Sequence, residues 1–163
     1  TVTRLLDMGM DPFNFADSLL GVLAQRLVRQ LCPHCRLSRP ATKAETEELM
    51  GDYLRPFSVE QRPSRETLLA DWVERFGSKG RVLLHHSPGC KHCDNTGFQG
   101  RAGIHELMVI SRELRRLIQT GARADALQQV AMAEGMRTLR QDGIEKVLAG
   151  VTTIEEVRAT SNV

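Results

Sequence analysis

The first regular pattern of hydrophobic and polar positions begins at Asp11-Pro12, which is typical of a helix N-cap followed by proline at the first helical position. Apolar residues then recur at steps of three and four, at Ala16, Leu20, Leu23, Leu27 and Leu31. This spacing predicts an amphipathic helix of about five turns that runs to the first cysteine.

The pattern changes between Arg36 and Pro88, where polar residues dominate and three prolines interrupt the chain. Thr42 with Glu45 predicts a capping box for a short helix that ends at Gly51. A second helix is expected to start at Ser64 and end at Gly77, with an apolar face of Leu68, Leu69, Trp72, Val73 and Phe76. The segment therefore resembles an insertion with two helices, followed by a short strand at Val82-Leu83-Leu84.

The remainder is predicted to be one strand followed by helices. Ala102–Ile110 indicates a largely buried strand. The helices are expected from a Ser111 cap to Gly121, over Ala124–Glu134, over Thr138–Ala149 with an interruption at Gly143, and after a capping box formed by Thr153 and Glu156. Because such short helices are unstable alone, they must pack on one another.

Composition limits the class of protein. The chain has 163 residues, which suits one domain or two small units, and its hydrophobic content of 41% is sufficient for a core. Aromatic residues make up only 4%, so that core is expected to be aliphatic, and the net charge of +2 does not demand a nucleic-acid partner. No apolar run approaches the roughly 18 residues that span a bilayer. Because the chain opens at Thr1, it is expected to be a fragment.

All four cysteines fall into two CxxC pairs, Cys32-Pro33-His34-Cys35 and Cys90-Lys91-His92-Cys93. Two tight turns of this kind, facing each other, form the tetrahedral thiolate site typical of structural zinc. Two disulfides would require an oxidising compartment, and the sequence has no signal-peptide pattern. A redox CxxC would normally stand alone at the start of a helix. A closed four-sulfur site has no open position for a substrate, which indicates an architectural role.

Histidines near the cysteines offer alternative ligands. His34 and His92 lie inside the two pairs, and His85 and His86 shortly precede the second pair. With four thiolates available, these histidines are expected to be turn or surface residues. If the metal closes the base of the insertion, residues 41–88 should become mobile on its removal, while a helical tail over residues 111–163 stays folded.

Other candidate chemistry is weak. Gly77-Ser78-Lys79-Gly80 lacks the glycine spacing of a phosphate-binding loop, and His105-Glu106 lacks the second histidine of a zinc protease motif. A basic run is more informative, because no acid interrupts Arg26, Arg29, Arg36 and Arg39. It indicates either a solvated face or contact with nucleotide phosphate, acidic lipid headgroups or an acidic partner.

Three stretches together resemble a known family: Arg4–Gly9 with Ala24–Cys32, Cys90–Glu106, and Met136–Gly143 with Gly150–Val157. The chain resembles the C-terminal part of the ATPases that power type II secretion and type IV pilus assembly. The resemblance is weakest between the two cysteine pairs, where the insertion looks longer than is typical.

The resemblance implies a mainly α fold with a small β component, attached to the edge of a RecA-like ATPase domain that is largely missing. Residues 1–31 would end that domain, 32–95 would form the tetracysteine zinc-binding insertion, 96–110 would be the strand returning to it, and 111–163 would be the helical subdomain. It implies that zinc is bound by Cys32, Cys35, Cys90 and Cys93.

The same resemblance implies a hexameric parent protein, cytoplasmic and peripheral to the bacterial inner membrane, that docks on a membrane platform. ATP and magnesium would belong to the full-length parent only. The Walker A and Walker B segments of the family lie upstream of the matching region, so this chain should be inactive alone. No catalytic residue is assigned, and no nucleic acid is expected as a partner. Two other classes stay open: a free-standing zinc-knuckle module that binds nucleic acid, and a thiol–disulfide protein.

Overall fold

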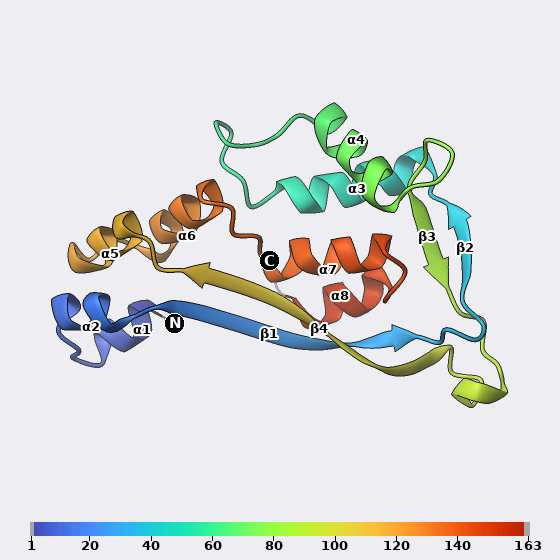
Figure 1. The fold of residues 1–163 in the computed structure, drawn as a ribbon, viewed down its shortest axis with the longest axis horizontal. Coiled ribbons are helices and arrows are strands. Elements are labelled where there is room, and N and C mark those ends of the chain that lie inside the picture. Colours follow the sequence, from blue (N-terminus) through green and yellow to red (C-terminus); the bar gives the residue numbers. More distant parts are fainter. Residues whose placement is uncertain (1, 162–163) are drawn as a thin grey trace. The chain divides into compact units, whose positions relative to one another are not determined.

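The computed structural model of the chain describes residues 2–161, which form eight α-helices, one short 3₁₀ helix and four β-strands (Figure 1). Two compact units are present. One groups the chain up to Ala24 with Glu106–Arg137, and the other groups Gln25–His105 with the residues from Thr138 onward. Within the described range, every helix is too short or too polar to cross a membrane.

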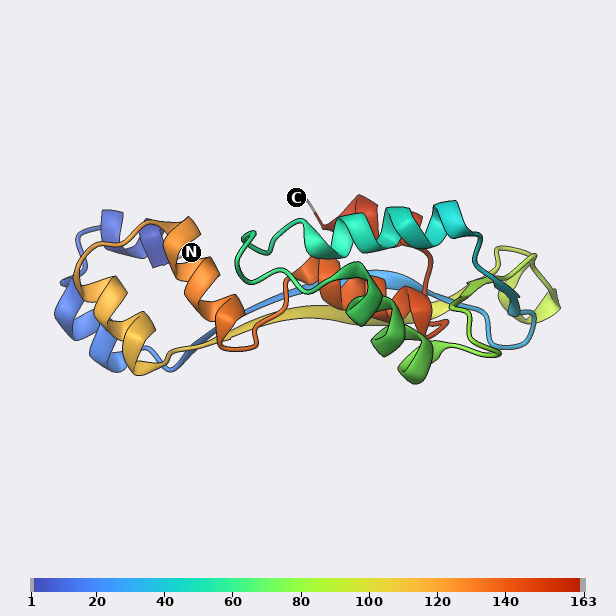
Figure 2. The same ribbon diagram turned by 90° about the horizontal axis from the view of Figure 1, so that it is seen from above.

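Two long strands, β1 (Gly21–Leu31) and β4 (Phe98–Val109), pair as a two-stranded sheet and run through both units (Figures 1 and 2). The helix expected to reach Leu31 is therefore wrong beyond its first two turns. Helix α2 covers only Pro12–Ser18, although its Asp11 cap is confirmed by a bond from the Asn14 amide.

The error has a physical cause. The leucines read as one helical stripe are largely exposed in the structure, with Leu20 at 82%, Leu23 at 60% and Leu27 at 51% of full accessibility. Pairing with β4, which starts 67 residues after the end of β1, overrides the local three-and-four spacing because strand pairing depends on tertiary context. The expectation that β4 is largely buried is also wrong, since Leu107 and Val109 are exposed and Ile104 is its buried residue.

The first unit has a largely aliphatic core built mainly by four short helices, α1 (Val2–Asp7), α2, α5 (Arg112–Gln119) and α6 (Ala124–Ala133). Its buried residues are Val2, Phe15, Ala16, Ile110, Leu114, Ile118, Leu127 and Ala131. The Ser111 cap of α5 is confirmed, and α6 has its expected bounds to within one residue. Local pattern was sufficient for α5 and α6, because each of these helices presents one apolar stripe to a common core, whereas α1 was not predicted.

The second unit contains an antiparallel pair of short strands, β2 (Leu37–Pro40) and β3 (Leu83–His86), with Leu37 opposite His86. Helix α3 (Lys43–Leu54) packs on α4 (Arg65–Phe76) and on α7 (Leu139–Leu148), which also contacts α8 (Ile154–Thr160) (Figures 1 and 2). The largest fully buried side chains of this unit include Trp72, Met50, Ile144, Leu148 and Val157.

Two glycines expected to end or interrupt helices lie inside them. Helix α3 begins with the expected Thr42–Glu45 capping box but continues through Gly51 to Leu54. Helix α7 passes through Gly143, where a Cβ atom would stand 2.4 Å from Cγ1 of Val157. Gly143 therefore serves close packing of α8 on α7, and the expected interruption is wrong.

The secondary structure is mixed, with more helix than strand, as expected of a mainly α chain with a small β component. The long β1 strand gives more sheet than the sequence predicted. Attachment to a RecA-like domain stays a prediction, as do the four domain boundaries. Residue 1 and residues 162–163, which the predicted first and last domains include, lie outside the described residues.

A four-cysteine cluster as candidate metal centre

The first CxxC turn follows directly from the end of β1. The Cys32 amide donates to the Gly97 carbonyl at 2.9 Å, and the Ser87 hydroxyl donates to the Cys32 carbonyl at 3.2 Å. One residue earlier, the Leu31 amide donates to the Val151 carbonyl at 2.8 Å. These bonds fix the start of the turn against the second turn and against the C-terminal helices.

The second CxxC turn is a 3₁₀ helix, η1 (Lys91–Cys93), in which the Cys90 carbonyl accepts from the amides of Cys93 and Asn95. Gly97 then closes the turn with φ of +80°, and a Cβ atom there would stand 2.4 Å from the Ser87 carbonyl oxygen. Only glycine fits this left-handed position so close to another backbone segment. The turn thus brings the second cysteine pair against the first.

The four sulfur atoms converge. Cys32, Cys35, Cys90 and Cys93 offer Sγ atoms that all lie within 4.8 Å of one another. The Cys32–Cys90 and Cys90–Cys93 pairs are each 3.9 Å apart, and the Cys35–Cys93 pair is 4.0 Å apart. A disulfide needs about 2.05 Å, whereas zinc–sulfur bonds of about 2.3 Å in a tetrahedron put sulfurs about 3.8 Å apart. The donor set and its spacing therefore fit one tetrahedral metal ion.

Backbone amides already favour the thiolate form at one of these sulfurs. Burial alone would raise the pKa of Cys93, but amide bonds from Cys90 at 3.2 Å and Gly97 at 3.3 Å lower it to about 6. Burial raises the pKa of the Cys35 thiol to about 11. Since a bound cation stabilises thiolates, the amides at Cys93 and a metal would act in the same direction.

The histidines lie around the cluster, and within the described residues the candidate ligand group consists of the four cysteines. The rings of His34 and His92 stack with centroids 4.0 Å apart, and His92 Nδ1 is 3.9 Å from Cys90 Sγ. His85 and His86 are on β3. Burial lowers the pKa of His85, and the nearby charge of Arg36 lowers it further. His34 and His92 lie in the two turns and His86 is exposed, as expected, whereas His85 is half-buried on β3 and is therefore not a surface residue.

Sequence reasoning missed the residues that hold the first turn from the C-terminal side. Glu156 of α8 accepts from the Arg29 amide at 2.9 Å and from its guanidinium at 2.6 and 2.9 Å. The Arg29 guanidinium also lies 4.1 Å from the centre of the Phe98 ring, and the Thr152 hydroxyl donates to the Arg29 carbonyl. In the predicted capping box, the Glu156 carboxylate would accept a hydrogen bond from the Thr153 amide. Thr153 does accept from the Glu156 amide, so half of that motif is present.

The basic run is largely used inside the chain. Arg29 pairs with Glu156, Arg39 pairs with Glu45 at 2.7 Å, and the Arg36 guanidinium donates to the Gly150 carbonyl at 2.7 Å. Arg26 donates to the neighbouring Gln25 carbonyl. Arg29 and Arg36 therefore join the segments around the cysteines to the C-terminal helices, contacts that neither sequence-based interpretation of the run had included.

The structure also shows the positions of two weaker motifs, the segment 77–80 and the His105-Glu106 pair. Gly77 is the C-cap of α4, and Ser78 and Arg81 form an isolated bridge, so this segment is a helix end followed by a turn, as expected. His105 and Glu106 lie on β4, where the His105 amide donates to Asp142 of α7.

Comparison with known proteins assigns the chain to a family. The family model described as "Type II/IV secretion system protein" matches residues 1–159. The chain is 39% identical over 158 residues, 97% of its length, to a type IV pilus assembly ATPase PilB of Thermus thermophilus, of which it covers 15%. It is 40% identical over 156 residues to the type II secretion system protein HxcR of Pseudomonas aeruginosa, covering 96% of this chain and 24% of that protein.

A third relative agrees. The type II secretion system protein E of Dickeya dadantii is 39% identical over 156 residues, covering 96% of this chain and 26% of that protein. The chain thus spans about a quarter or less of the length of these relatives. The family match extends over nearly the whole chain, including the segment between the two cysteine pairs, and the chain belongs to the type II/IV secretion system protein family.

Proposed function

We propose that this chain is a non-catalytic, C-terminal part of a hexameric secretion or pilus-assembly ATPase, in which a zinc ion held by Cys32, Cys35, Cys90 and Cys93 stabilises the architecture. The observation that carries the proposal is the convergence of four sulfurs, all within 4.8 Å, in a chain whose relatives are named as secretion and pilus ATPases. A four-thiolate donor set is the usual closed structural zinc site.

The position of the cluster explains what the metal would contribute. Cys32 and Cys90 are 58 positions apart in the sequence, and helices α3 and α4 lie between them. Bringing the ends of so long a segment together costs conformational entropy, which a metal at its base would offset. Structural zinc sites in small domains contribute on the order of 10 kcal/mol of apparent folding free energy.

The wider role of the parent protein follows from the names of the relatives. A pilus-assembly or secretion ATPase would carry its nucleotide-binding residues, with ATP and magnesium, in segments outside this chain. The part described here would then serve in packing between subunits and in docking to an inner-membrane platform on the cytoplasmic side. We expect no ATP turnover from the isolated chain, and activity that co-elutes with pure chain would contradict this assignment.

Metal analysis tests the central claim. The chain, purified without chelator, should contain one zinc per molecule, and Cys90→Ser should lose most of it because one of four ligands is replaced. His92→Ala is the matched control, since it alters the same turn and leaves all four thiols. An ordered, metal-free protein whose thiols are paired in disulfides would instead identify a thiol–disulfide protein.

A further inference from the structure

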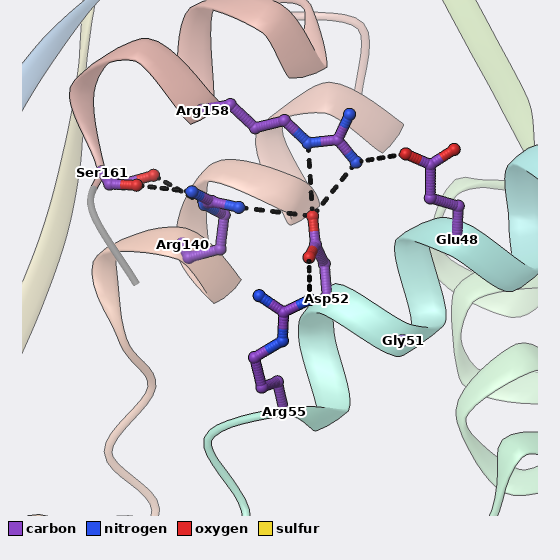
Figure 3. Close-up of a pocket in the computed structure, with 7 residues that line it drawn as sticks. All are labelled: Glu48, Gly51, Asp52, Arg55, Arg140, Arg158 and Ser161. Carbon is purple, nitrogen blue, oxygen red and sulfur yellow. Dashed lines mark hydrogen bonds and ion pairs between the residues drawn. The ribbon is translucent and has the colours of Figure 1, made fainter.

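A polar pocket of about 680 Å³ lies in the second unit, away from the cysteines (Figure 3). Three arginines contribute to its wall: Arg55 at the C-terminal end of α3, Arg140 on α7 and Arg158 on α8. The other residues that line it are Glu48, Gly51, Asp52 and Ser161. Three separate elements thus direct guanidinium groups toward one hollow.

All three arginines share one carboxylate, which Figure 3 shows at their centre. Asp52 is 10% exposed, and its oxygens lie 3.3 Å from Arg55, 3.3 Å from Arg140 and 3.1 Å from Arg158. Several arginine–carboxylate pairs elsewhere in the chain are shorter, at 2.6 Å for Arg29–Glu156 and 2.7 Å for Arg65–Glu47, although the highly exposed Arg123–Asp125 pair is longer at 3.9 Å. Charge-assisted bonds of this kind normally measure about 2.7–2.9 Å. One carboxylate therefore does not satisfy three guanidinium groups at optimal distance.

Donor capacity remains after the internal contacts are counted. Arg55 uses only Nη2 in its contact with Asp52, and Arg158 uses Nε and Nη2 with Asp52 and Glu48. Within residues 2–161, Arg55 Nε and Nη1 and Arg158 Nη1 have no acceptor. Three guanidinium groups against the carboxylates of Glu48 and Asp52 also leave one net positive charge at the pocket. The unused donors and the net positive charge both favour the binding of an additional anion.

We propose that this pocket binds a phosphate group, as free phosphate, a phosphate monoester or a phospholipid headgroup. The Asp52 carboxylate leaves some of the guanidinium N–H donors unused, because its two oxygens lie in one plane and cannot contact all of them. A tetrahedral phosphate has additional acceptor oxygens, which can bridge Arg55 and Arg158 and take up the remaining positive charge. The proposal rests on the arginine geometry alone and does not depend on the metal or on the role assigned to the parent protein.

Titration with sodium phosphate tests the site. Amide chemical shifts of the labelled, metal-loaded chain should change at residues 48–55 and 158–161, with sodium chloride at equal ionic strength as the reference. Vesicles of phosphatidylglycerol, compared with phosphatidylcholine in a sedimentation assay, form the second arm. Vesicle binding that depends on Arg55 identifies a lipid headgroup as the source of the phosphate. Shifts with phosphate and no vesicle binding identify a free or small-molecule phosphate.

Three variants separate the site from general charge effects. Arg55→Gln should weaken phosphate binding by about tenfold or more, the usual effect of losing a charge-assisted bond. Arg26→Gln is the matched control, because it removes the same charge from an exposed position that contacts only a backbone carbonyl, and it should leave binding unchanged. Asp52→Asn should act in the opposite direction and tighten binding, since it removes the internal competitor without changing shape.

The proposal is overturned if neither phosphate nor anionic vesicles bind the folded chain. It is also overturned if Arg26→Gln weakens binding as much as Arg55→Gln, because the effect would then reflect net charge. Should Asp52→Asn unfold the chain, Arg158→Gln replaces it as the second test, with the same tenfold weakening expected. Zinc content, measured on each sample, keeps a failure of this site distinct from a failure of the metal centre.

Discussion

The two compact units of this chain are held together in different ways. The first has a continuous aliphatic core from short helices, and its ion pairs, Glu113–Arg116 and Arg123–Asp125, join near neighbours on the surface. The second combines its own apolar core with the cysteine cluster and with ion pairs between distant segments, such as Arg29–Glu156 and Arg75–Glu145. Stability in the first is therefore mainly hydrophobic, whereas the second also has specific polar contacts between distant segments and the cysteine cluster, at which we propose a metal ion.

The C-terminal helices are divided between these two units. The sequence suggested one helical tail from residue 111 onward, but α5 and α6 belong to the first unit and α7 and α8 to the second. The turn after α7 is bonded to the cysteine region, through the Val151 carbonyl to Leu31 and the Gly150 carbonyl to Arg36. Helices α5 and α6 therefore lie in the unit with the largely aliphatic core, and α7 and α8 lie in the unit that contains the cysteine cluster.

Removing the metal should give the largest effect. We expect a strong chelator to abolish amide protection at residues 32–40 and 83–97 and to lower it in α3 and α4, because the cluster closes the base of these elements. Helices α5 and α6 should keep their protection, since their core lacks cysteine. Residues 150–156 should lose part of theirs, because they bond to the first turn. Hydrogen exchange by mass spectrometry measures all four regions in one experiment.

Two outcomes would change this comparison. Equal loss of protection in both units would mean that the chain unfolds as one cooperative body. Full retention at residues 150–156 would instead support the sequence-based prediction that the whole tail is independent of the metal. Trp72, the single tryptophan, is fully buried in α4 and provides an independent fluorescence signal for the second unit.

The packing of α8 on α7 should give the next largest effect. Gly143→Ala places a Cβ atom 2.4 Å from Val157 Cγ1, and overpacking of this kind typically costs about 1–3 kcal/mol. Gly51→Ala is the matched control, because the nearest atom there is Arg65 Nη2 at 3.8 Å. It should stabilise α3 by about 0.5–1 kcal/mol through the better helix propensity of alanine. Urea unfolding followed by Trp72 fluorescence measures both changes, and a neutral Gly143→Ala would contradict the close packing.

These glycines show where sequence reasoning reached its limit. A glycine inside a helical pattern can end the helix or allow another helix to pack closely against it. At Gly143, only the position of Val157 distinguishes these two roles. Helices α5 and α6 of the first unit were predictable because caps and apolar stripes are local, whereas α1 was not predicted and α2 was predicted too long. Strand β1 was not predictable, because its leucines also fit a helix and its pairing with β4 is long-range.

The cysteine cluster shows the same limit of prediction from sequence. Two CxxC pairs were sufficient to predict that four sulfurs converge, since the spacing itself directs each pair to one point. The supporting contacts could not be found in this way. Glu156 bears a local capping motif with Thr153, yet its carboxylate accepts from Arg29, more than a hundred residues away. The three-arginine pocket likewise unites residues from three separate elements.

The Arg29–Glu156 contact should give a smaller, pH-dependent effect. The hydrogen bond from the Arg29 side chain lowers the pKa of Glu156 below its usual value. The contribution to stability is therefore complete above the ordinary glutamate pKa of about 4.3 and is lost as the pH falls through the lower folded value. Glu156→Gln should reduce stability at pH 7 and show a shallower loss on acidification. Urea unfolding at pH 7 and pH 3 measures the difference, and identical pH profiles would exclude a role for this carboxylate.

The smallest effect is expected in the first unit, at the surface pair Glu113–Arg116. The two side chains are 47% and 61% exposed and lie one helical turn apart on α5, with a charge-assisted bond from Arg116 that lowers the pKa of Glu113. Exposed pairs of this kind are screened by water and salt, so Arg116→Gln should leave the unfolding midpoint unchanged within error. Ile118→Ala, about two helical turns after the Ser111 cap of α5 and fully buried, should cost about 2–5 kcal/mol in the same unit. If Arg116→Gln approached the effect of Ile118→Ala, the first unit would depend on polar contacts as the second does, and the contrast between the two units would not hold.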